Sequence, residues 1–188
     1  MSELRIGCVV MAAGTGRRFG GDKLGAVVDG KTLIRHALEA VPAEELSRVI
    51  VVTGHDEVKE CAREFSFTVI DNPHPDWGQS YSIRLGLSEL MDCDAVLFQV
   101  ADQPHLTRES VRSLVEFYRQ HPDHIVALAH QGKRGNPCLF PAVFFPEIMA
   151  LDGDVGGNIV IHHHMDQLLL WEVPVEELRD IDTREQLP

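Results

Sequence analysis

Six short, continuous apolar runs constrain the fold of this chain more than any other feature of its sequence. The runs span residues 6–11, 49–53, 67–70, 95–100, 125–129 and 168–173. Most are rich in Val and Ile and do not alternate with polar residues, which is typical of strands covered on both faces. Between them, apolar residues recur every three or four positions, the spacing of one helix face, over residues 32–41, 82–91 and 107–119. Alternating strands and helices predict an α/β fold, with a Rossmann-like, mostly parallel sheet of about six or seven strands flanked by helices.

Length and composition place these elements in one domain. With 188 residues, 44% of them hydrophobic, the chain has the size of a single domain that buries its own core. We therefore expect one domain over residues 1–188. The formal charge of −12 argues against general binding to nucleic acid or to an anionic membrane, because both need a basic face. A small anionic ligand needs only local positive charge.

The cysteines and the apolar runs do not indicate export or a membrane. Cys8, Cys61, Cys93 and Cys138 are far apart and form no Cys-x-x-Cys pair, so we expect free thiols, with Cys8 and Cys93 buried. No apolar run approaches the ~20 residues of a membrane span, and the chain opens with no leader pattern. These features predict a cytoplasmic protein.

Two polar loops are predicted at one edge of the sheet. The glycine-rich segment 12–23 follows the first predicted strand, and the segment 101–107 follows the fourth. Because ligands of such sheets bind beyond the carboxyl ends of the strands, we expect both loops to contribute to one site. The stretches 71–80 and 132–141, rich in Pro and Gly, are predicted to be loops over that site. Thr107 is predicted to cap the helix that follows it.

The sequence VVMAAGTGRRFGGDKL, residues 9–24, does not match two common nucleotide-binding motifs. In the dinucleotide fingerprint G-x-G-x-x-G, the glycine after Gly14 and Gly16 would come one residue before Gly20. In the Walker A motif, a magnesium-binding Ser or Thr would follow Lys23, where this chain has Leu24.

A third arrangement uses the residues that are present. Glycines let backbone N–H groups wrap closely around phosphates. Arg17 or Arg18 can bind phosphate oxygens through two hydrogen bonds, and Lys23 adds a compact positive charge. The loop contains no evident nucleophile, so it is predicted to hold a triphosphate while another group attacks it.

The segment AAGTGRRFGGDKL at 12–24 resembles the signature loop of the nucleotidyltransferases, which join a nucleoside monophosphate to a phosphorylated acceptor and release pyrophosphate. The resemblance extends over nearly the whole chain through NPHPDWGQSYSIRLGL at 72–87, ADQPHLT at 101–107, RGNPCLFP at 134–141, GDVGG at 153–157 and DIDTREQL at 180–187. Within this superfamily the chain is most similar to the molybdenum cofactor cytidylyltransferases. The resemblance implies the fold of the nucleotide-diphospho-sugar transferases. It also implies transfer of CMP from CTP to the phosphate of molybdopterin, with Mg²⁺ or Mn²⁺ as cofactor.

The resemblance assigns roles to particular residues. Asp102, at the end of an apolar strand, is the expected Mg²⁺ ligand, since this ion takes one or two carboxylates together with phosphate oxygens; a helix cap or a turn residue is the alternative. The predicted catalytic residues are Arg17, Arg18, Lys23 and Asp102. The predicted nucleotide-binding residues are Ala12, Ala13, Gly14, Thr15, Gly16, Lys23, Asn72, Gly78, Ser80 and Ser82. For Asn72, Gly78, Ser80 and Ser82, the alternative is an ordinary loop in which Ser80 caps the following helix.

The acceptor is expected to bind the region of about 130–165, whereas the N-terminal part binds the nucleotide. Gly135 allows close contact there, and Asn136 offers hydrogen bonds; a plain hairpin turn is the alternative. Asp154 is a further predicted acceptor contact. Asp152 or Asp154 is alternatively a second metal ligand, or part of a turn that starts a helix.

Two other polar features are interpreted as structural. Asp182 precedes Thr183 and is interpreted as the cap of the last helix. His162, His163 and His164 are consecutive, so they cannot share one face of a helix or strand, and they are not predicted to form a metal site.

The sequence leaves alternatives for the base of the nucleotide and for the acceptor. Ala13 and Phe19 are similar to the cytidylyl branch, because guanylyl-transferring relatives usually have glycine and methionine at these places; Gly16 departs from the serine common in the cytidylyl branch. One alternative is guanylyl or other NTP transfer to molybdopterin or to a sugar or polyol phosphate. Others are a non-catalytic accessory protein that delivers the cofactor to a molybdenum hydroxylase, and an NAD(P)-dependent oxidoreductase. CTP, molybdopterin and a molybdenum hydroxylase are the expected partners.

Overall fold

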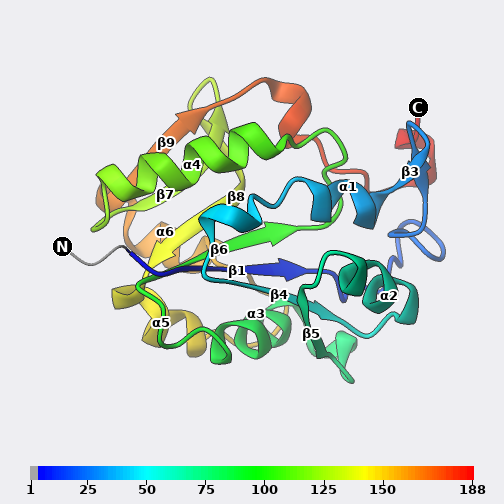
Figure 1. Cartoon of the computed structure of the whole chain (residues 1–188), viewed down its shortest axis with the longest axis horizontal. Helices are drawn as coiled ribbons and strands as arrows, with labels where there is room; N and C mark the ends of the chain where they lie inside the picture. The colour runs from blue at the N-terminus through cyan, green and yellow to red at the C-terminus, as the bar shows by residue number, and fades with distance from the viewer. Residues whose placement is uncertain (1–3) are drawn as a thin grey trace.

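The computed structural model describes residues 4–188, which form one α/β domain built on a seven-stranded sheet (Figure 1). Residues 1–3 lie outside the described residues, so the structure does not describe the start of the segment in which no leader pattern was predicted. The strand order is β5-β4-β1-β6-β8-β7-β9. The strands are β1 Ile6–Met11, β4 Arg48–Thr53, β5 Thr68–Asp71, β6 Ala95–Val100, β7 Ile125–His130, β8 Lys133–Pro141 and β9 Leu168–Glu172. Within this sheet every pairing is parallel except those of β8, so the predicted fold class is confirmed.

Helices cover both faces of the sheet. They are α1 Leu33–Glu39, α2 Asp56–Glu64, α3 Gln79–Ser88, α4 Arg108–Gln120, α5 Phe145–Met149 and α6 Asn158–His163. One hydrophobic core joins α1, α2 and α4 to the strands, and a second joins α3, α5 and α6 to the opposite face. Figure 1 shows α4 and α3 on opposite sides of the strands. Short 3-10 turns are η1 Ala43–Glu45, η2 Pro75–Trp77, η3 Ala142–Phe144, η4 Met165–Gln167, η5 Val175–Leu178 and η6 Arg184–Gln186.

The central strand β1 shows why the apolar runs are strands. Cys8 and Val10 pack in the core that contains α1 and α4, whereas Val9 packs in the core that contains α3. Because successive side chains point to opposite faces, a strand covered on both sides needs apolar residues throughout. Each of the six predicted runs forms a strand whose ends differ by at most one residue from the prediction.

The prediction of a loop over 132–141 is wrong. This stretch contains β8, which pairs antiparallel with both β6 and β7. Its first half, around Gly135 and a cis Asn136–Pro137 bond, lacks any strand pattern, while Leu139 and Phe140 are buried. Both neighbours supply hydrogen bonds to a central strand, so its own sequence need not show a regular period.

The other local predictions are mostly confirmed. The stretch 71–80 is largely a loop that contains η2, and the three predicted helices are α1, α3 and α4. Thr107 caps α4, since its hydroxyl accepts a hydrogen bond from Ser110 N at 3.2 Å. Helices α2, α5 and α6 were not predicted. A separate hairpin, β2 (Val27–Val28) and β3 (Lys31–Thr32), follows the glycine-rich loop.

The side chains of Cys8, Cys61, Cys93 and Cys138 are all buried, as predicted for Cys8 and Cys93. Over residues 4–188, none of the helices has both the length and the apolar character that crossing a membrane requires.

Candidate active site

The glycine-rich loop leaves β1 at the carboxyl edge of the sheet and turns sharply. The backbone N–H groups of Phe19 and Gly20 both donate to the Gly16 carbonyl at 3.0 Å. Gly16 has a φ of +62°, and a Cβ there would lie 2.5 Å from the Gly21 carbonyl oxygen, so the turn requires glycine. Phe19 is buried in a small apolar cluster that anchors the loop to the rest of the molecule.

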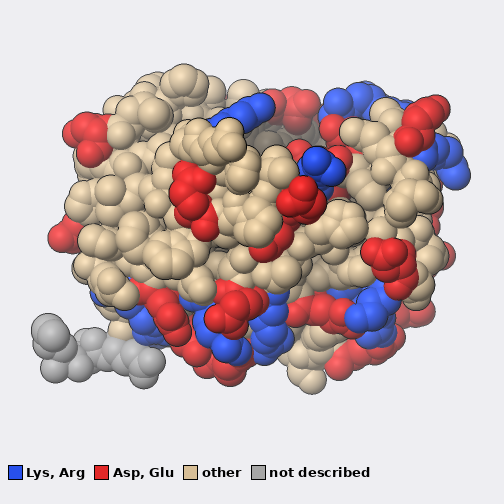
Figure 2. Space-filling view, turned by 90° about the horizontal axis from the view of Figure 1, so that it is seen from above, with Lys and Arg blue, Asp and Glu red and all other residues tan. Residues whose placement is uncertain are grey.

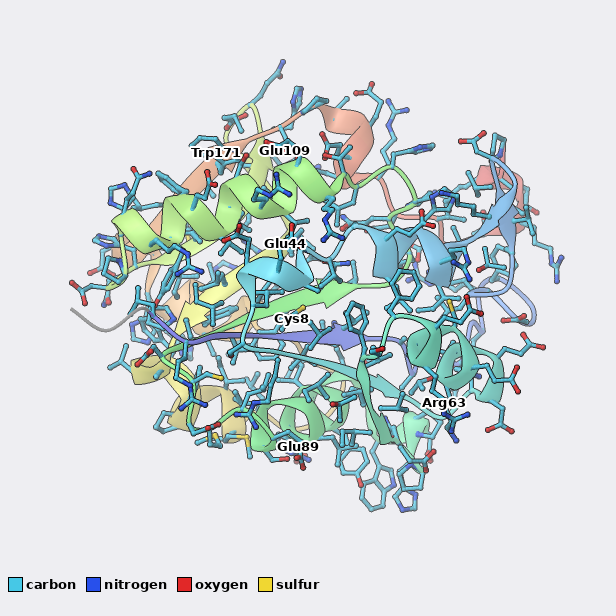
Figure 3. The ribbon with its side chains drawn as sticks, in the orientation of Figure 1. Cys8, Glu44, Arg63, Glu89, Glu109 and Trp171 are labelled. Carbon is cyan, nitrogen blue, oxygen red and sulfur yellow. The ribbon has the colours of Figure 1, made fainter. Side chains whose placement is uncertain are left out.

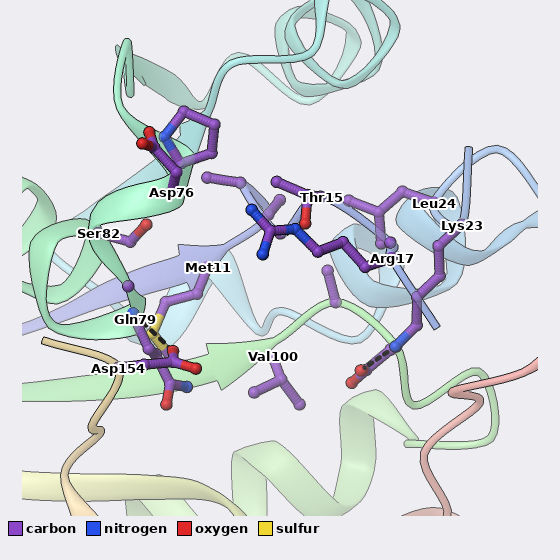
Figure 4. A pocket seen from close by; sticks show the side chains of 18 of the residues that line it. Met11, Thr15, Arg17, Lys23, Leu24, Asp76, Gln79, Ser82, Val100 and Asp154 are labelled. Atoms are coloured by element: carbon purple, nitrogen blue, oxygen red, sulfur yellow. Dashed lines mark hydrogen bonds and ion pairs between the residues drawn. The ribbon is translucent and has the colours of Figure 1, made fainter. Parts of the chain in front are cut away.

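This loop forms one wall of a cavity of about 550 Å³ beyond the carboxyl ends of β1 and β6 (Figure 4). The segment before α3 and the segment between α5 and α6 form the opposite wall. The lining comprises residues 11–19, 23–24, 75–79, 82, 100–102, 153–154 and 182. The loops 12–23 and 101–107 therefore meet at one site, as the strand order predicts.

Lys23 connects the floor of the cavity to the C-terminal segment. Its Nζ donates to Asp102 Oδ2 at 2.7 Å and to Asp182 Oδ1 at 3.0 Å; Figure 4 shows the ammonium of Lys23 against a carboxylate. The Lys23 side chain is only 15% exposed. Burial alone would lower the pKa of Lys23, but hydrogen bonds to the two carboxylates and their negative charges outweigh it and raise the pKa. Lys23 is therefore an ammonium held between two acids.

A third carboxyl group, that of Asp180, lies near this ion pair. Burial raises the pKa of Asp180 to about 6, with further contributions from the negative charges of Asp102 and Asp182 and an opposing one from Lys23. The backbone keeps these groups together, because Ile181 N donates to the Asp102 carbonyl at 2.9 Å. The segment after β6 and the C-terminal segment thus form one acidic cluster around one ammonium.

The interpretation of Asp182 as a helix cap is wrong. Thr183 caps η6 through a capping box with Gln186, which leaves the Asp182 carboxylate free to contact Lys23. Asp182 Oδ2 also lies 3.5 Å from Arg18 Nη1. The sequence signals at Asp182 are its alternation with Asp180 and its place in the segment DIDTREQL. Neither signal shows that Asp182 meets Lys23, because the two residues are far apart in sequence and come together only through folding.

The two arginines of the glycine-rich loop point in different directions, Arg18 into solvent and Arg17 into the cavity. The Arg18 side chain is 78% exposed, and its contact with Asp182 is long. Figure 4 shows the Arg17 side chain extending across the cavity toward the wall that carries Asp76 and Ser82. Arg17 is thus directed at the space where a ligand of the loop would lie.

Of the residues predicted on the opposite wall, Gly78 and Ser82 line the cavity, whereas Asn72 and Ser80 lie behind it. Asn72 is buried and donates from Nδ2 to Ser82 Oγ at 2.9 Å. The Ser80 hydroxyl donates to the Gly153 carbonyl at 2.7 Å, and it does not cap α3. Asn72 and Ser80 hold the wall in shape.

Of the predicted acceptor residues, Asp154 lines the cavity, and its Oδ1 accepts from Gln79 N at 3.2 Å. Gly135 and Asn136 lie on β8, outside the lining. Gly135 packs against Leu178, where an added Cβ would lie 3.1 Å from its side chain.

Two of the consecutive histidines converge on one carboxylate. His163 Nδ1 and His164 Nε2 lie 2.6 and 2.7 Å from the two oxygens of Glu147 on α5. The two histidines do not share one helix face here, because α6 ends at His163 and His164 has already left helical geometry. These contacts lower the pKa of Glu147 and join α5 to α6.

The donor set around Lys23 fits a hard divalent cation. Asp102 and Asp182 each give one carboxylate oxygen to the Lys23 ammonium and keep a second oxygen, and Mg²⁺ is usually held by one or two carboxylates together with substrate phosphates. Within residues 4–188 no group of three or more His, Cys, Asp or Glu forms a complete metal cage. The two carboxylates would therefore share the cation with a bound phosphate.

A protein-family profile described as "MobA-like NTP transferase domain" matches residues 8–168. Purine catabolism protein PucB of Bacillus subtilis (strain 168) is 27% identical, covering 95% of this chain and 92% of PucB. Nicotine blue oxidoreductase of Paenarthrobacter nicotinovorans is 26% identical, covering 95% of this chain and 93% of that protein. A molybdenum cofactor guanylyltransferase of Shewanella sp. (strain MR-4) is 27% identical, covering 72% of this chain and 67% of the enzyme.

Solved structures share the fold. A nucleotidyl transferase from Methanothermobacter thermautotroptrophicus superposes with a TM-score of 0.79 at 25% identity, covering 98% of this chain and 94% of that one. Rv0371c of Mycobacterium tuberculosis H37Rv, solved as a complex with manganese, superposes with a TM-score of 0.72 at 20% identity over 90% of this chain and 88% of that one.

Proposed function

Because the chain belongs to the MobA-like NTP transferase domain family, we propose that it transfers CMP from CTP to the terminal phosphate of molybdopterin, with Mg²⁺ or Mn²⁺ as cofactor. The observation that carries the proposal is the position of Lys23, between Asp102 and Asp182 beside the glycine-rich wall of the cavity. Backbone N–H groups, an ammonium and two carboxylates together suit a triphosphate and its counter-ion.

The proposed reaction is an in-line displacement at the α-phosphorus of CTP. An oxygen of the acceptor phosphate forms the new P–O bond, the bond from the α-phosphorus to its bridging oxygen breaks, and pyrophosphate leaves with the electron pair. A phosphate monoester is already anionic near neutral pH, with a second pKa of about 6, so no strong general base is needed. The chain's contribution is to position the reactants and to neutralise charge.

The residues on the loop wall have separate tasks in this scheme. The backbone of Gly14 and Gly16 would approach the triphosphate closely, and Arg17, which extends from the same wall into the cavity, would bind its oxygens. Lys23 stabilises the charge that gathers on pyrophosphate, for which its ammonium gives up at least one carboxylate contact. A divalent cation on Asp102, with Asp182 as its second ligand, would offset charge on the phosphate oxygens.

Residues on the opposite wall would receive the base and the acceptor. Ser82 and Gly78 offer a hydroxyl and open backbone to the nucleotide, while Asn72 and Ser80 support them. Asp154 lies on the same wall and is the acceptor contact that we retain. Gly135 and Asn136 would act only indirectly, through β8.

CTP is proposed from the Ala13 and Phe19 positions of the loop. Guanylyl transfer is the second candidate, favoured by the similarity to a molybdenum cofactor guanylyltransferase. The similarity to nicotine blue oxidoreductase over most of both chains keeps an oxidoreductase among the outcomes to be tested.

The test is pyrophosphate release by the purified protein with each NTP, combined with molybdopterin, a sugar phosphate or a polyol phosphate. We expect release with CTP and molybdopterin that requires Mg²⁺ or Mn²⁺. Pyrophosphate release with GTP in place of CTP would change the proposed nucleotide to GTP. Release with a sugar or polyol phosphate would change the proposed acceptor to that phosphate. Tight molybdopterin binding without release from any NTP would indicate an accessory protein that delivers the cofactor to a molybdenum hydroxylase. Binding of NADH in a titration would favour the oxidoreductase.

A further inference from the structure

Trp77 is a large apolar side chain that is 53% exposed at the cavity. It ends η2, directly before Gly78 and α3. A single exposed apolar residue is ordinary on a protein surface. Trp77 differs because it lines a cavity and because other aromatic rings hold its indole in place.

The neighbouring rings leave one face of the indole open. The His74 imidazole stacks on Trp77 with ring centroids 3.9 Å apart and planes 9° apart. The Tyr81 ring lies 4.9 Å from Trp77 and 6.1 Å from His74. These three distances form a triangle with nearly a right angle at Trp77, so Tyr81 lies at the edge of the indole and not over its second face. One face is covered by His74 and one edge is braced by Tyr81; neither ring covers the other face, and Trp77 as a whole is 53% exposed.

The support beneath this face is anchored in the fold. Trp77 N donates to the His74 carbonyl at 3.1 Å, and His74 N donates to Asn72 Oδ1 at 2.9 Å. Asn72 is 1% exposed and also bonds Ser82. On the other side, the Arg84 guanidinium packs over the Tyr81 ring at 5.9 Å. The indole is therefore pre-organised, which reduces the entropic cost of stacking a ligand on it.

Trp77 also belongs to the same wall as Asp154. Gly78 has a φ of +91°, and a Cβ there would lie 2.5 Å from the backbone of Gly153, so the two segments are locked together. Gln79 N donates to Asp154 Oδ1, and a carboxylate has further acceptor capacity. In Figure 4, Gln79 and Asp154 lie at the opposite end of the cavity from Lys23.

We propose that the open face of Trp77 is a stacking subsite for the planar ring system of the acceptor, a pterin under the proposed function, with Asp154 accepting hydrogen bonds from the ring N–H groups. A fused bicyclic ring matches the area of an indole, and the amino-pyrimidinone edge of a pterin carries the N–H donors that a carboxylate requires. Asp154 lies at the other end of the cavity from Lys23 in Figure 4, which leaves the Lys23 end to the triphosphate. This inference rests on the proposed acceptor.

The test measures binding of neopterin monophosphate, a stable pterin with a phosphorylated side chain, by isothermal titration. The variants are Trp77→Ala, Trp77→Phe and, as a matched control, Trp171→Ala. The chain has two tryptophans, and Figure 3 shows Trp171 beside α4, on the other side of the sheet from Glu89 at the end of α3. Binding of CTP with Mg²⁺ is measured in parallel, and thermal unfolding checks each fold.

We expect Trp77→Ala to weaken pterin binding about 10- to 100-fold, the effect typical of one lost aromatic stack, and Trp77→Phe to restore most of it. Trp171→Ala should bind the pterin as the wild type does, and CTP binding should change less than about twofold in all variants. With molybdopterin as acceptor, Trp77→Ala should raise the acceptor KM far more than it lowers kcat.

Unchanged pterin binding by Trp77→Ala would overturn the subsite while leaving the transfer reaction intact. Weakened CTP binding with normal pterin binding would assign the indole to the nucleotide base and overturn the proposal equally. A wild-type protein that binds no pterin but releases pyrophosphate with another acceptor overturns both the subsite and the molybdopterin assignment.

Discussion

At the scale of single residues, one ammonium carries most of the electrostatics of the candidate site. Lys23 is largely buried and shared by Asp102 and Asp182, which belong to distant parts of the chain. Without Lys23 these carboxylates would lose the ammonium that they share, although the exposed Arg18 would stay near Asp182. They lie close to Asp180, whose pKa is already raised to about 6 by burial and by their charges. Lys23 therefore both balances the negative charge of the acidic cluster and supplies a positive charge for the proposed reaction.

We predict that Lys23→Met lowers kcat/KM for CTP by at least about 100-fold, because a charge positioned at the leaving group contributes roughly 3–4 kcal/mol in comparable sites. Steady-state pyrophosphate release measures the change. Lys31→Met is the matched control, since its ammonium lies on the exposed hairpin and pairs with Glu39. Normal turnover by a folded Lys23→Met variant would rule out the proposed role of Lys23.

A second residue-scale prediction concerns Asp182, which the sequence pattern did not mark as a site residue. Asp182→Asn should raise the Mg²⁺ concentration needed for half-maximal activity by about tenfold, the scale of one weakened charge-assisted contact. A titration of activity against Mg²⁺ gives the value. Asp166→Asn, on the exposed turn η4, serves as the control. Equal Mg²⁺ requirements for both variants would remove Asp182 from the metal site.

At the scale of elements, the C-terminal segment holds the cavity floor and one helix start together. Glu177 on η5 is buried and accepts hydrogen bonds from the Thr107 N–H at 3.0 Å and from its hydroxyl at 2.9 Å. Thr107 begins α4, which follows the segment that carries Asp102. The segment therefore contacts the floor through Asp182 and α4 through Glu177.

We predict that Thr107→Ala lowers the free energy of unfolding by about 2 kcal/mol, because it removes both a helix cap and a hydrogen bond to a buried carboxylate. For a chain of this size the melting temperature should fall by about 4–8 °C. Thr107→Ser keeps the hydroxyl and should retain most of the stability. If thermal unfolding of the Ser and Ala variants coincides, the hydroxyl does not matter and the explanation fails.

At the scale of the whole molecule, the cavity joins segments from both layers of the fold. Its walls come from the loop after β1 and from the segments that flank α3 and α6, while its floor follows β6. On the face shown in Figure 2, basic side chains are interspersed with acidic ones across a largely uncharged surface. Because the cavity walls come from separate parts of the fold, a ligand that bridges them should stabilise the entire domain.

We predict that CTP with Mg²⁺, at about 100 times its dissociation constant, raises the melting temperature by about 5–10 °C, the shift that about 2.7 kcal/mol of linked binding produces. Chelating the metal should remove most of this shift, and Asp102→Asn should not show it. Thermal unfolding with each NTP measures the effect. A larger shift with GTP would support guanylyl transfer, and no shift with any NTP would contradict nucleotide binding at this cavity.

The sequence by itself determined the features that depend on local pattern. Short apolar runs rich in Val and Ile are typical of strands in a sheet covered on both faces, and a glycine-rich loop after such a strand is expected at the carboxyl edge of the sheet. Thr107 and the Gly16 turn belong to this class, because a few neighbouring residues decide the conformation.

Only the tertiary structure decided which distant residues meet. Strand β8 exists because β6 and β7 supply its hydrogen bonds, although its first half reads as a turn. Asp182 becomes a partner of Lys23, and Trp77 becomes a braced surface beside Asp154, through contacts between segments far apart in sequence. A short segment of sequence indicates which secondary structure its residues favour and which of them are buried. It does not encode how the layers pack, and that packing decides which charged groups and aromatic rings from distant segments meet.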